Sequence, residues 1–383
     1  MKIAIITTSG RDLLKRWETT EPGIGTAVEA LLHGFRLLPE HEVHVLMPVR
    51  RNVQPVRRDG NIFYHEVPTP MWGMMKSLYL GSARAVRKKL REIQPDIVHG
   101  QGTERECAMS AVLSGFPNVV TIHGNMAELA RLFPPRFGSF GWLAARLENY
   151  ALRRTAGVFC NSAYTEDLVR PRAKKVWRVP NALRPIFFDA PLLSPGGAAR
   201  CVILNIGVIS ARKRQLEMLG MVENLHRQGF EFEFRFIGRL DSGDDYCRAF
   251  LERLKPLEAA GVARHLDSRT TEELIRHFDA AAGLVHFPSE EAFGLVVAEA
   301  LARDLKFFGA RLGGIVDIAG SAPGAELFGR EDWAGLTAAV GRWIGGGHAR
   351  TPGAAAVMRE RYHPQAIARR HTEIYGAALK TVS

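Results

Sequence analysis

The sequence is poor in long apolar segments and in cysteine. No run approaches the ~18 apolar residues that a membrane-spanning helix needs. The four cysteines stand far apart and form no CxxC pair, which argues against a disulfide framework or a zinc site and favours a reducing cytoplasm. The short apolar run in residues 1–8 predicts a first buried strand, because a secretion signal needs a longer apolar region and a small-residue cleavage site.

Acidic charge is scarce in the first half of the chain. Of the 51 Lys and Arg and the 40 Asp and Glu, residues 1–190 hold 27 and 17, a balance of +10, and the remainder holds 24 and 23, a balance of +1. A basic half attracts anionic partners such as acidic lipid or phosphorylated acceptors, and we expect no nucleic acid among them. A basic surface that is simply exposed to solvent is the alternative.

The length of 383 residues suits two domains of about 150–200 residues each. Short β-rich apolar runs alternate with helical patterns, and the alternation restarts after a turn-rich stretch. We therefore predict an α/β protein with two doubly wound, Rossmann-like domains and a ligand-binding cleft between them. The expected boundaries are 1–185, a linker at 186–200, 201–364, and a C-terminal helix at about 365–383 that packs back on the first domain.

Residues 287–317 carry the most informative pattern. A strand ends, an acidic loop containing Glu291 follows, and a helix begins near Gly294, with Glu299 about one turn inside it. The first N–H groups of such a helix and its dipole favour an anion. A carboxylate at each end of a phosphate-binding turn suits hydroxyls on both sides of a diphosphate, as in a nucleotide sugar. The turn itself is formed by Phe293, Gly294, Leu295 and Val296.

A second basic segment follows the first strand of the second domain. Gly207 ends this strand, and Lys213 comes six residues later, directly after Arg212. Two cations at the carboxyl edge of a sheet can offset the charge that develops on a leaving diphosphate. The alternative for Arg212 is a solvated basic turn, and this alternative applies more strongly to Arg214.

These segments resemble the family 4 retaining glycosyltransferases, which have the GT-B fold. Glu291 and Glu299 match the E-x7-E signature of that family, and the Arg212-Lys213 pair is similar to that of lipopolysaccharide-core glucosyltransferases. The likeness extends over nearly the whole chain. The family's glycine-rich first loop, PDIVH strand, VTIHG strand and GG-x-x-(E or D) element correspond to residues 22–26, 95–99, 120–124 and 313–317.

The resemblance implies transfer from a nucleotide-sugar donor to an acceptor hydroxyl, with retention of configuration and without a metal or other cofactor. Glu299 would hold the ribose hydroxyls, and Glu291 those of the transferred sugar. Lys213 would contact the diphosphate, with Arg212 as a second cation, and His123 would face the donor sugar across the cleft. Asp244 and Asp245 lie in a polar loop and predict a helix cap, not a metal-binding pair.

The first loop and three departures from the family pattern concern the rim of the site. Gly23 and Gly25 would let the loop approach the donor phosphates or the acceptor, although a lone GxG also fits a plain tight turn. Val208 stands where many members have Arg, Asp267 replaces a glycine, and residues 304–306 replace Gly-x-Pro. The resemblance therefore leaves the nucleotide base open.

The acceptor is expected on the basic first domain. Residues 72–80 lead into a basic run at 84–91, and residues 132–143 mix aromatic residues with Arg, a composition that suits an anionic membrane surface. This favours a glycan or lipid-linked acceptor and a cytoplasmic protein that is peripheral on the inner face of the membrane. The alternative is that the apolar side chains pack inward and the basic face is exposed to solvent without binding a partner. A GT-B epimerase and a non-catalytic module for anionic lipid are the other interpretations of the chain.

Overall fold

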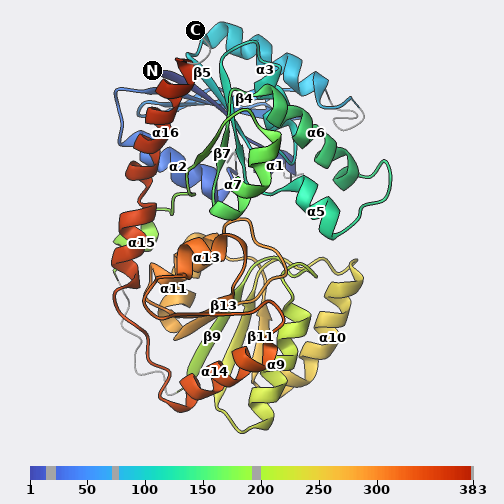
Figure 1. Ribbon diagram of the computed structural model, residues 1–383, viewed down its shortest axis with the longest axis vertical. Helices are drawn as coiled ribbons and strands as arrows, with labels where there is room; N and C mark the ends of the chain where they lie inside the picture. Colours follow the sequence, from blue (N-terminus) through green and yellow to red (C-terminus); the bar gives the residue numbers. More distant parts are fainter. Residues whose placement is uncertain (14–22, 71–76, 192–199, 381–383) are drawn as a thin grey trace. The chain divides into compact units, whose positions relative to one another are not determined.

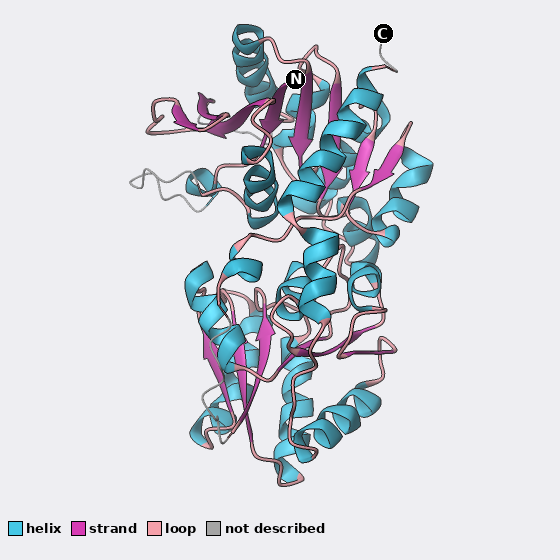
Figure 2. Ribbon diagram, turned by 90° about the vertical axis from the view of Figure 1, so that its left-hand side faces the viewer, coloured by secondary structure: helices cyan, strands magenta, loops and turns pink. Residues whose placement is uncertain are grey.

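The computed structural model describes residues 1–13, 23–70, 77–191 and 200–380. The chain forms two compact units, Met1–Pro185 with Tyr362–Ser383, and Ile186–Arg361. Each unit contains one mainly parallel sheet covered by helices, which confirms the predicted α/β class with two Rossmann-like sheets (Figures 1 and 2). Residues 72–76, which open one predicted aromatic and basic segment, lie outside the described residues, as do Pro22 and most of the predicted linker.

The first unit has an eight-stranded sheet in the order β3-β4-β2-β1-β5-β6-β7-β8. Its strand pairs are parallel except β3 with β4. β1 and β2 are buried along nearly their whole length, because helices cover both faces of the sheet. The strands are β1 (Lys2–Ile6), β2 (Glu42–Val49), β3 (Arg57–Asp59), β4 (Ile62–Pro68), β5 (Ile97–Gln101), β6 (Asn118–Ile122), β7 (Val158–Cys160) and β8 (Val176–Arg178).

Helices of the first unit connect these strands. The last helix of the chain also belongs to this unit. α16 (Pro364–Leu379) packs along α2 (Thr26–Arg36) (Figure 1). Gly34 permits this approach, because a Cβ there would lie 2.1 Å from the carbonyl oxygen of Pro364. The remaining helices are α1 (Gly10–Leu13), α3 (Leu80–Ile93), α4 (Glu106–Val112), α5 (Met126–Leu132), α6 (Phe140–Arg154), α7 (Ala163–Val169) and the 3-10 turn η1 (Arg170–Arg172).

The second unit has a six-stranded parallel sheet in the order β11-β10-β9-β12-β13-β14. Its strands are β9 (Cys201–Ile206), β10 (Phe232–Ile237), β11 (Ala263–Leu266), β12 (Gly283–His286), β13 (Lys306–Ala310) and β14 (Ala325–Phe328). Its helices are α8 (Ile186–Asp189), α9 (Gln215–Arg227), α10 (Asp245–Ala259), α11 (Thr271–Ala280), α12 (Leu295–Leu301), α13 (Gly313–Ala319) and α14 (Trp333–Gly345), and α15 (Ala354–Tyr362) leads out of the unit.

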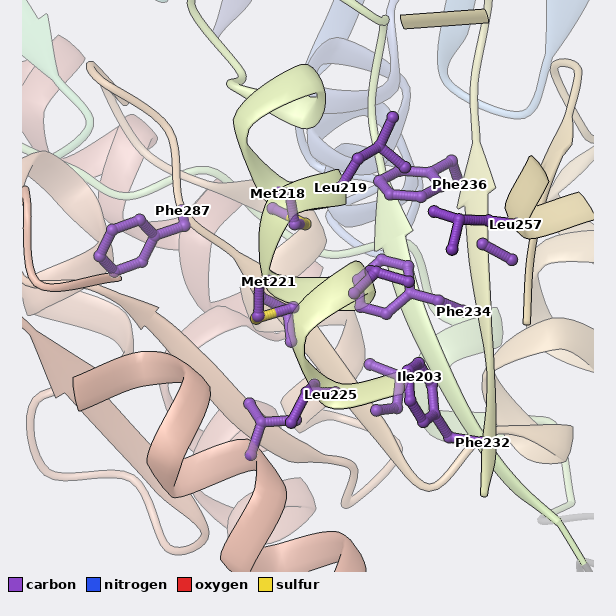
Figure 3. Close-up of a cluster of buried hydrophobic side chains, with 14 of the residues drawn as sticks. Ile203, Met218, Leu219, Met221, Leu225, Phe232, Phe234, Phe236, Leu257 and Phe287 are labelled. Carbon is purple, nitrogen blue, oxygen red and sulfur yellow. The ribbon is translucent and has the colours of Figure 1, made fainter. Parts of the chain in front are cut away.

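Alternating phenylalanines build the core of the second unit. Phe232, Phe234 and Phe236 project from one face of β10, as the two-residue period of a strand requires, and all three are fully buried. Methionine and leucine side chains of α9 lie against them (Figure 3). Each buried phenylalanine contributes about 1.5–3 kcal/mol relative to an exposed one. This packing holds α9 on the sheet and so fixes the loop between β9 and α9.

The strand order indicates where a ligand is expected to bind. Along the second sheet the chain runs outward from β9 in one direction and from β12 in the other, so the loops after these two neighbouring strands diverge. In open α/β sheets ligands bind at the carboxyl ends of strands at such a switch point. β1 and β5 form the corresponding point of the first sheet.

Candidate functional site

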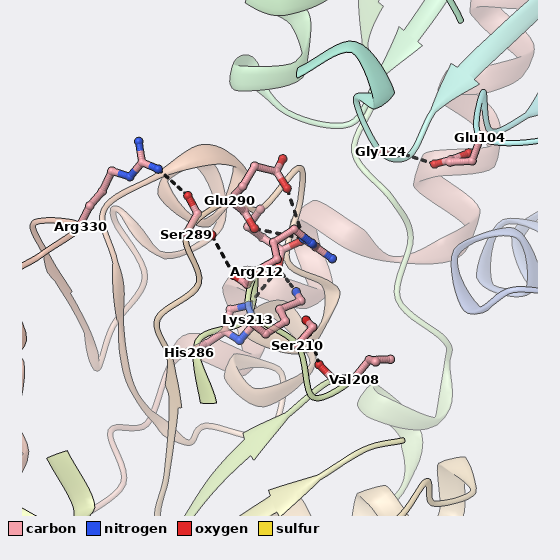
Figure 4. A network of polar contacts seen from close by, with 11 residues as sticks. Glu104, Gly124, Val208, Ser210, Arg212, Lys213, His286, Ser289, Glu290 and Arg330 are labelled. Atoms are coloured by element: carbon pink, nitrogen blue, oxygen red, sulfur yellow. Dashed lines mark hydrogen bonds and ion pairs between the residues drawn. The ribbon is translucent and has the colours of Figure 1, made fainter. Parts of the chain in front are cut away.

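Lys213 and Glu291 meet at the carboxyl edge between β9 and β12. Lys213 lies in the loop after β9, where its N–H donates to the carbonyl oxygen of Ser210 over 2.9 Å. Its Nζ forms an ion pair with Oε2 of Glu291, and the two side chains are only 14% and 11% exposed. The Nε2 atom of His286, at the end of β12, lies 2.9 Å from the same carboxylate oxygen. Figure 4 shows His286 beside Lys213. The structure thus brings two predicted residues together and adds His286.

Electrostatics keep Glu291 ionised. Burial by itself raises the pKa of this carboxyl, but the nearby Lys213 ammonium and the hydrogen bond from His286 outweigh it, and the pKa is lowered from its ordinary value. Burial lowers the pKa of His286, so a neutral imidazole donates Nε2–H to the carboxylate. Sequence reasoning missed His286. Its position at a strand end, five residues before a predicted acid, was the available signal.

Arg212 is tied to the same loop through Glu290. Its Nη1 donates to Oε2 of Glu290 over 3.2 Å and to the Glu290 carbonyl oxygen over 3.1 Å. The carbonyl oxygen of Arg212 accepts from the Ser289 N–H over 2.9 Å and from the Ser289 hydroxyl over 3.2 Å (Figure 4). Burial raises the pKa of Glu290. Arg212 therefore lies beside Lys213 as expected, but it carries a buried acidic partner that the sequence pattern did not indicate.

The two glycines of the GG-x-x-(E or D) element pack against the acidic loop. A Cβ on Gly313 would lie 2.0 Å from the carbonyl oxygen of Glu291, and one on Gly314 would lie 2.5 Å from the Cα of Phe293. The N–H of Gly314 donates to the Glu291 carbonyl oxygen over 3.1 Å. Only glycine allows backbones to approach this closely. The element therefore fixes the backbone from which the Glu291 side chain projects.

α12 begins where the sequence indicated. Gly294 is its N-cap residue with a φ of 98°, in the left-handed region that favours glycine. Leu295 and Val296 open the helix, and the Phe293 side chain is buried in the unit. Glu299 lies inside the helix and is also buried. The contacts of these residues with a donor stay predictions.

Three positions that depart from the family pattern have defined settings. Val208 is exposed directly after Gly207, at the edge where many family members place Arg, and Asp267 follows the end of β11. Asp304 adopts a φ of 54°, a conformation that glycine takes without strain. Its side chain accepts a hydrogen bond of 2.8 Å from the N–H of Ala355. This bond accounts for an Asp at a strained turn between α12 and β13.

His123 and its neighbours form a separate group at the carboxyl edge of the first sheet. His123 follows β6, and its Nε2 lies 3.0 Å from Oε1 of Gln101, at the end of β5. Burial lowers the pKa of His123 to about 4, so the ring is neutral at pH 7. Glu104 accepts a hydrogen bond of 2.8 Å from the N–H of Gly124 (Figure 4), and burial raises the pKa of this carboxyl. Sequence reasoning missed Gln101 and Glu104.

The first-loop glycines belong to the same unit as His123. Gly23 has a φ of 57°, and its carbonyl oxygen accepts a hydrogen bond of 2.7 Å from the N–H of Gly10. Gly25 caps α2 and accepts from the N–H groups of Val28 and Glu29. Both glycines shape the entry into α2. Their approach to a ligand stays a prediction.

Other expectations concern metals, caps and cysteines. The side chain of Asp244 accepts from the N–H of Cys247 over 3.1 Å, which confirms the predicted helix cap. The four cysteines are buried and free. Within the described part of the chain, no three His, Cys, Asp or Glu side chains are grouped so that they could hold a metal ion.

Residues 23–185 match the family model described as Glycosyltransferase Family 4. This match confirms the resemblance that the motifs indicated, over most of the first unit. No curated protein matches the sequence of this chain.

Solved structures match the whole chain in fold. Sucrose-phosphate synthase from Thermosynechococcus elongatus has a TM-score of 0.80 at 16% identity, with 100% of both chains covered. Anabaena HepE in complex with UDP and glucose has a TM-score of 0.71 at 16% identity, covering 98% of this chain and 100% of that one. An E. coli protein described as "Trehalose-6-phosphate", bound with UDP-2-fluoro glucose, has a TM-score of 0.70 at 12% identity, with 99% of each chain covered. The chain thus combines the GT-B fold with a Glycosyltransferase Family 4 segment.

Proposed function

We propose that this protein is a retaining glycosyltransferase that moves a sugar from a nucleotide-sugar donor to an acceptor hydroxyl without a metal ion. The observation that carries the proposal is the group of Lys213, Glu291 and His286 at the switch point of the second sheet. It offers a cation for a diphosphate directly beside an ionised carboxylate for sugar hydroxyls. The family match and the shared fold support the same reaction class.

In the proposed reaction, the acceptor oxygen forms a bond to the anomeric carbon while the bond from this carbon to the diphosphate breaks. Lys213 stabilises the negative charge that passes to the leaving diphosphate, and Arg212 assists it. A phosphate oxygen of the leaving group takes the proton of the acceptor hydroxyl. Glu291 orients the transferred sugar, and Glu299 holds the ribose. Because Lys213 is paired with Glu291, the donor diphosphate has to share this ammonium with the carboxylate.

We propose a UDP-sugar as the donor to test first. Among the compared proteins, HepE was solved in complex with UDP and glucose, and the E. coli protein with UDP-2-fluoro glucose bound. The motifs of this chain leave the base open, so GDP- and ADP-sugars belong in the same screen.

Donor binding provides the first test. In isothermal titration calorimetry we expect UDP or another nucleoside diphosphate to bind, and the matching nucleotide sugar to be converted only with an acceptor. Binding to none of the UDP-, GDP- and ADP-sugars would contradict the proposal and favour a non-catalytic module. Conversion of the donor to its epimer in the absence of acceptor would favour an epimerase.

The acceptor side of the proposal rests on a surface of the first unit, which we call the α5–α6 surface and define by residues 131–142. Phe133, Phe137 and Phe140 are 46%, 86% and 38% exposed there, and Arg131 and Arg136 lie in the same segment. None of the residues of α5 is buried. Exposed aromatic and basic residues suit an anionic lipid interface. We propose a lipid-linked acceptor and a peripheral position on the cytoplasmic face.

The basic helix α3 fits the alternative that its positive charge is simply exposed to solvent. Its apolar residues Ala83, Val86, Leu90 and Ile93 are buried, and its arginines face solvent. The charge on α3 is therefore an exposed face of an ordinary amphipathic helix. No helix among the described residues is both long and apolar enough to cross a membrane.

Vesicle sedimentation tests the α5–α6 surface. The native protein should sediment with vesicles that contain phosphatidylglycerol at low salt, and less at high salt, because charge attraction is screened. Phe137→Ser should weaken binding about tenfold or more, since burying a phenylalanine contributes about 1.5–3 kcal/mol. Val53→Ser, at another exposed apolar position of the same unit, is the matched control and should change little. Absence of sedimentation at low salt would rule out the membrane proposal.

A further inference from the structure

Gln101 is a buried amide between His123 and the interior of the first unit. Its Oε1 lies 3.0 Å from Nε2 of His123. An amide oxygen can only accept a hydrogen bond, so the imidazole must carry its proton on Nε2. The amide Nε2 of Gln101 lies on the side of His99, 3.4 Å from each nitrogen of that ring. The amide therefore has its oxygen toward His123 and its nitrogen toward His99.

The setting of Gln101 is rigid. His99 is fully buried, with its Nδ1 2.6 Å from the Tyr375 hydroxyl and its Nε2 2.7 Å from the Thr121 hydroxyl. Tyr375 comes from α16, so the last helix of the chain supports this group from the side of α2. Gly102, directly after Gln101, has a φ of 93°, and a Cβ there would lie 3.6 Å from Cδ2 of His123. That distance is ordinary contact, but the same Cβ would lie only 2.5 Å from Oε2 of Glu104, so a side chain here would displace the Glu104 carboxylate.

We propose that Gln101 is a positioning residue that holds His123 in the Nε2–H tautomer and leaves Nδ1 as an acceptor for a substrate hydroxyl. The inference rests on the proposed function and on the family resemblance, which implies that His123 faces the donor sugar. The sequence motifs marked His123 alone. The partner that decides which ring nitrogen is free comes from the neighbouring strand β5.

The charges around His123 agree with a neutral ring. The titratable groups that face it are Glu104 from the loop after β5, His99 from β5 and His371 from α16. Burial lowers the pKa of His99 well below its usual range and that of His371 to about 4, and it raises that of Glu104. A ring that stays neutral at pH 7 can accept a hydrogen bond from a hydroxyl group through Nδ1, and it does not act as a general acid.

The test measures the tautomer and titration of His123 by ¹⁵N NMR on the full chain, without relying on turnover. The native protein should show the Nε2–H tautomer at pH 7. Gln101→Glu places a carboxylate against the imidazole and should raise the pKa of His123 by about 1 unit or more, because a nearby negative charge favours the protonated ring. Gln101→Leu removes the acceptor of this proton and should lower the share of the Nε2–H tautomer. Gln94→Glu, which adds the same charge at the exposed C-cap of α3, is the matched control and should leave His123 unchanged.

Two results would overturn the proposal. One is an Nδ1–H tautomer in the native protein, and the other is a folded Gln101→Glu variant in which His123 titrates as in the native chain. UDP-glucose, but not UDP, should shift the Nδ1 resonance. Binding of UDP-glucose without such a shift would remove the substrate-facing role. If calorimetry shows that the protein binds no nucleotide, this result counts against the proposed function instead. Failure of the Gln101 proposal and failure of the proposed function are therefore distinguishable.

Discussion

A folded Lys213→Met variant should transfer sugar at least about a hundredfold more slowly than the native protein, by analogy with the loss of one preorganised electrostatic stabiliser. This corresponds to about 2.7 kcal/mol of transition-state stabilisation. Methionine keeps the apolar stem and removes the ammonium that is paired with Glu291. Because the proposed role of Lys213 is to bind the diphosphate, the variant should also bind UDP more weakly in calorimetry.

The control for this substitution is Lys255→Ala on α10. Lys255 forms an exposed ion pair with Glu252, 2.7 Å apart, and such pairs contribute only about 0–1 kcal/mol. Its loss should leave turnover within about twofold of native, since its charge is far more solvated than that of Lys213. Near-native transfer by a Lys213→Met variant with a native circular dichroism spectrum would contradict the assignment of the donor site.

Replacement of Glu291 by Ala should also lower turnover at least about a hundredfold, but with a different binding signature. The carboxylate is proposed to hold the transferred sugar, so UDP should bind as well as before or more tightly, because Lys213 is released from its ion pair. UDP-glucose should no longer bind more tightly than UDP. Comparing the two ligands by calorimetry in both variants separates the diphosphate contact from the sugar contact.

The stability of the Glu291→Ala variant needs its own measurement. The substitution removes the acceptor of the His286 Nε2–H, and an unsatisfied buried donor costs about 1–3 kcal/mol. Urea unfolding of the variant should show a loss in this range. Glu252→Ala, at an exposed carboxylate, should lose far less. The assignment of the diphosphate contact to Lys213 and of the sugar contact to Glu291 would be contradicted by either of two results. One is a Glu291→Ala variant that keeps native turnover, and the other is a Glu291→Ala variant that binds UDP as weakly as Lys213→Met does.

The pH dependence of the native protein follows from the same site. Since the pKa of Glu291 is lowered, its carboxylate stays ionised through the mildly acidic range. The part of stability that comes from this group is present above its unfolded-state pKa and is lost only as the pH falls below it. A decline in rate just below neutral pH would therefore have to come from another group.

Local patterns in the chain were sufficient to predict the fold class and to identify Lys213 and Glu291 as site residues. Alternation of β-rich and helical segments indicates a parallel sheet, because each period reflects which side chains a single element buries. Lys213 and Glu291 could be marked because each follows the end of a strand, and parallel strands end at the same edge. The helix start at Gly294 was also readable, since its turn residues are contiguous in sequence.

The partners of these residues could be found only in the folded chain. Lys213 and Glu291 are 78 residues apart, and they meet because β9 pairs with β12. Glu290 reaches Arg212 across the same edge. Gln101 reaches His123 through the pairing of β5 with β6. Such contacts depend on strand order, which no local periodicity encodes.

For Glu291 and Lys213, the sequence and the tertiary structure therefore decide different properties. Their residue types and their places at strand ends were decided by the sequence itself, because these are local properties. Their ion pair, the hydrogen bond from His286 and the resulting ionised carboxylate were decided by the tertiary structure. The physical reason is that burial and pairing set the charge of a group, and both arise only when distant strands pack side by side.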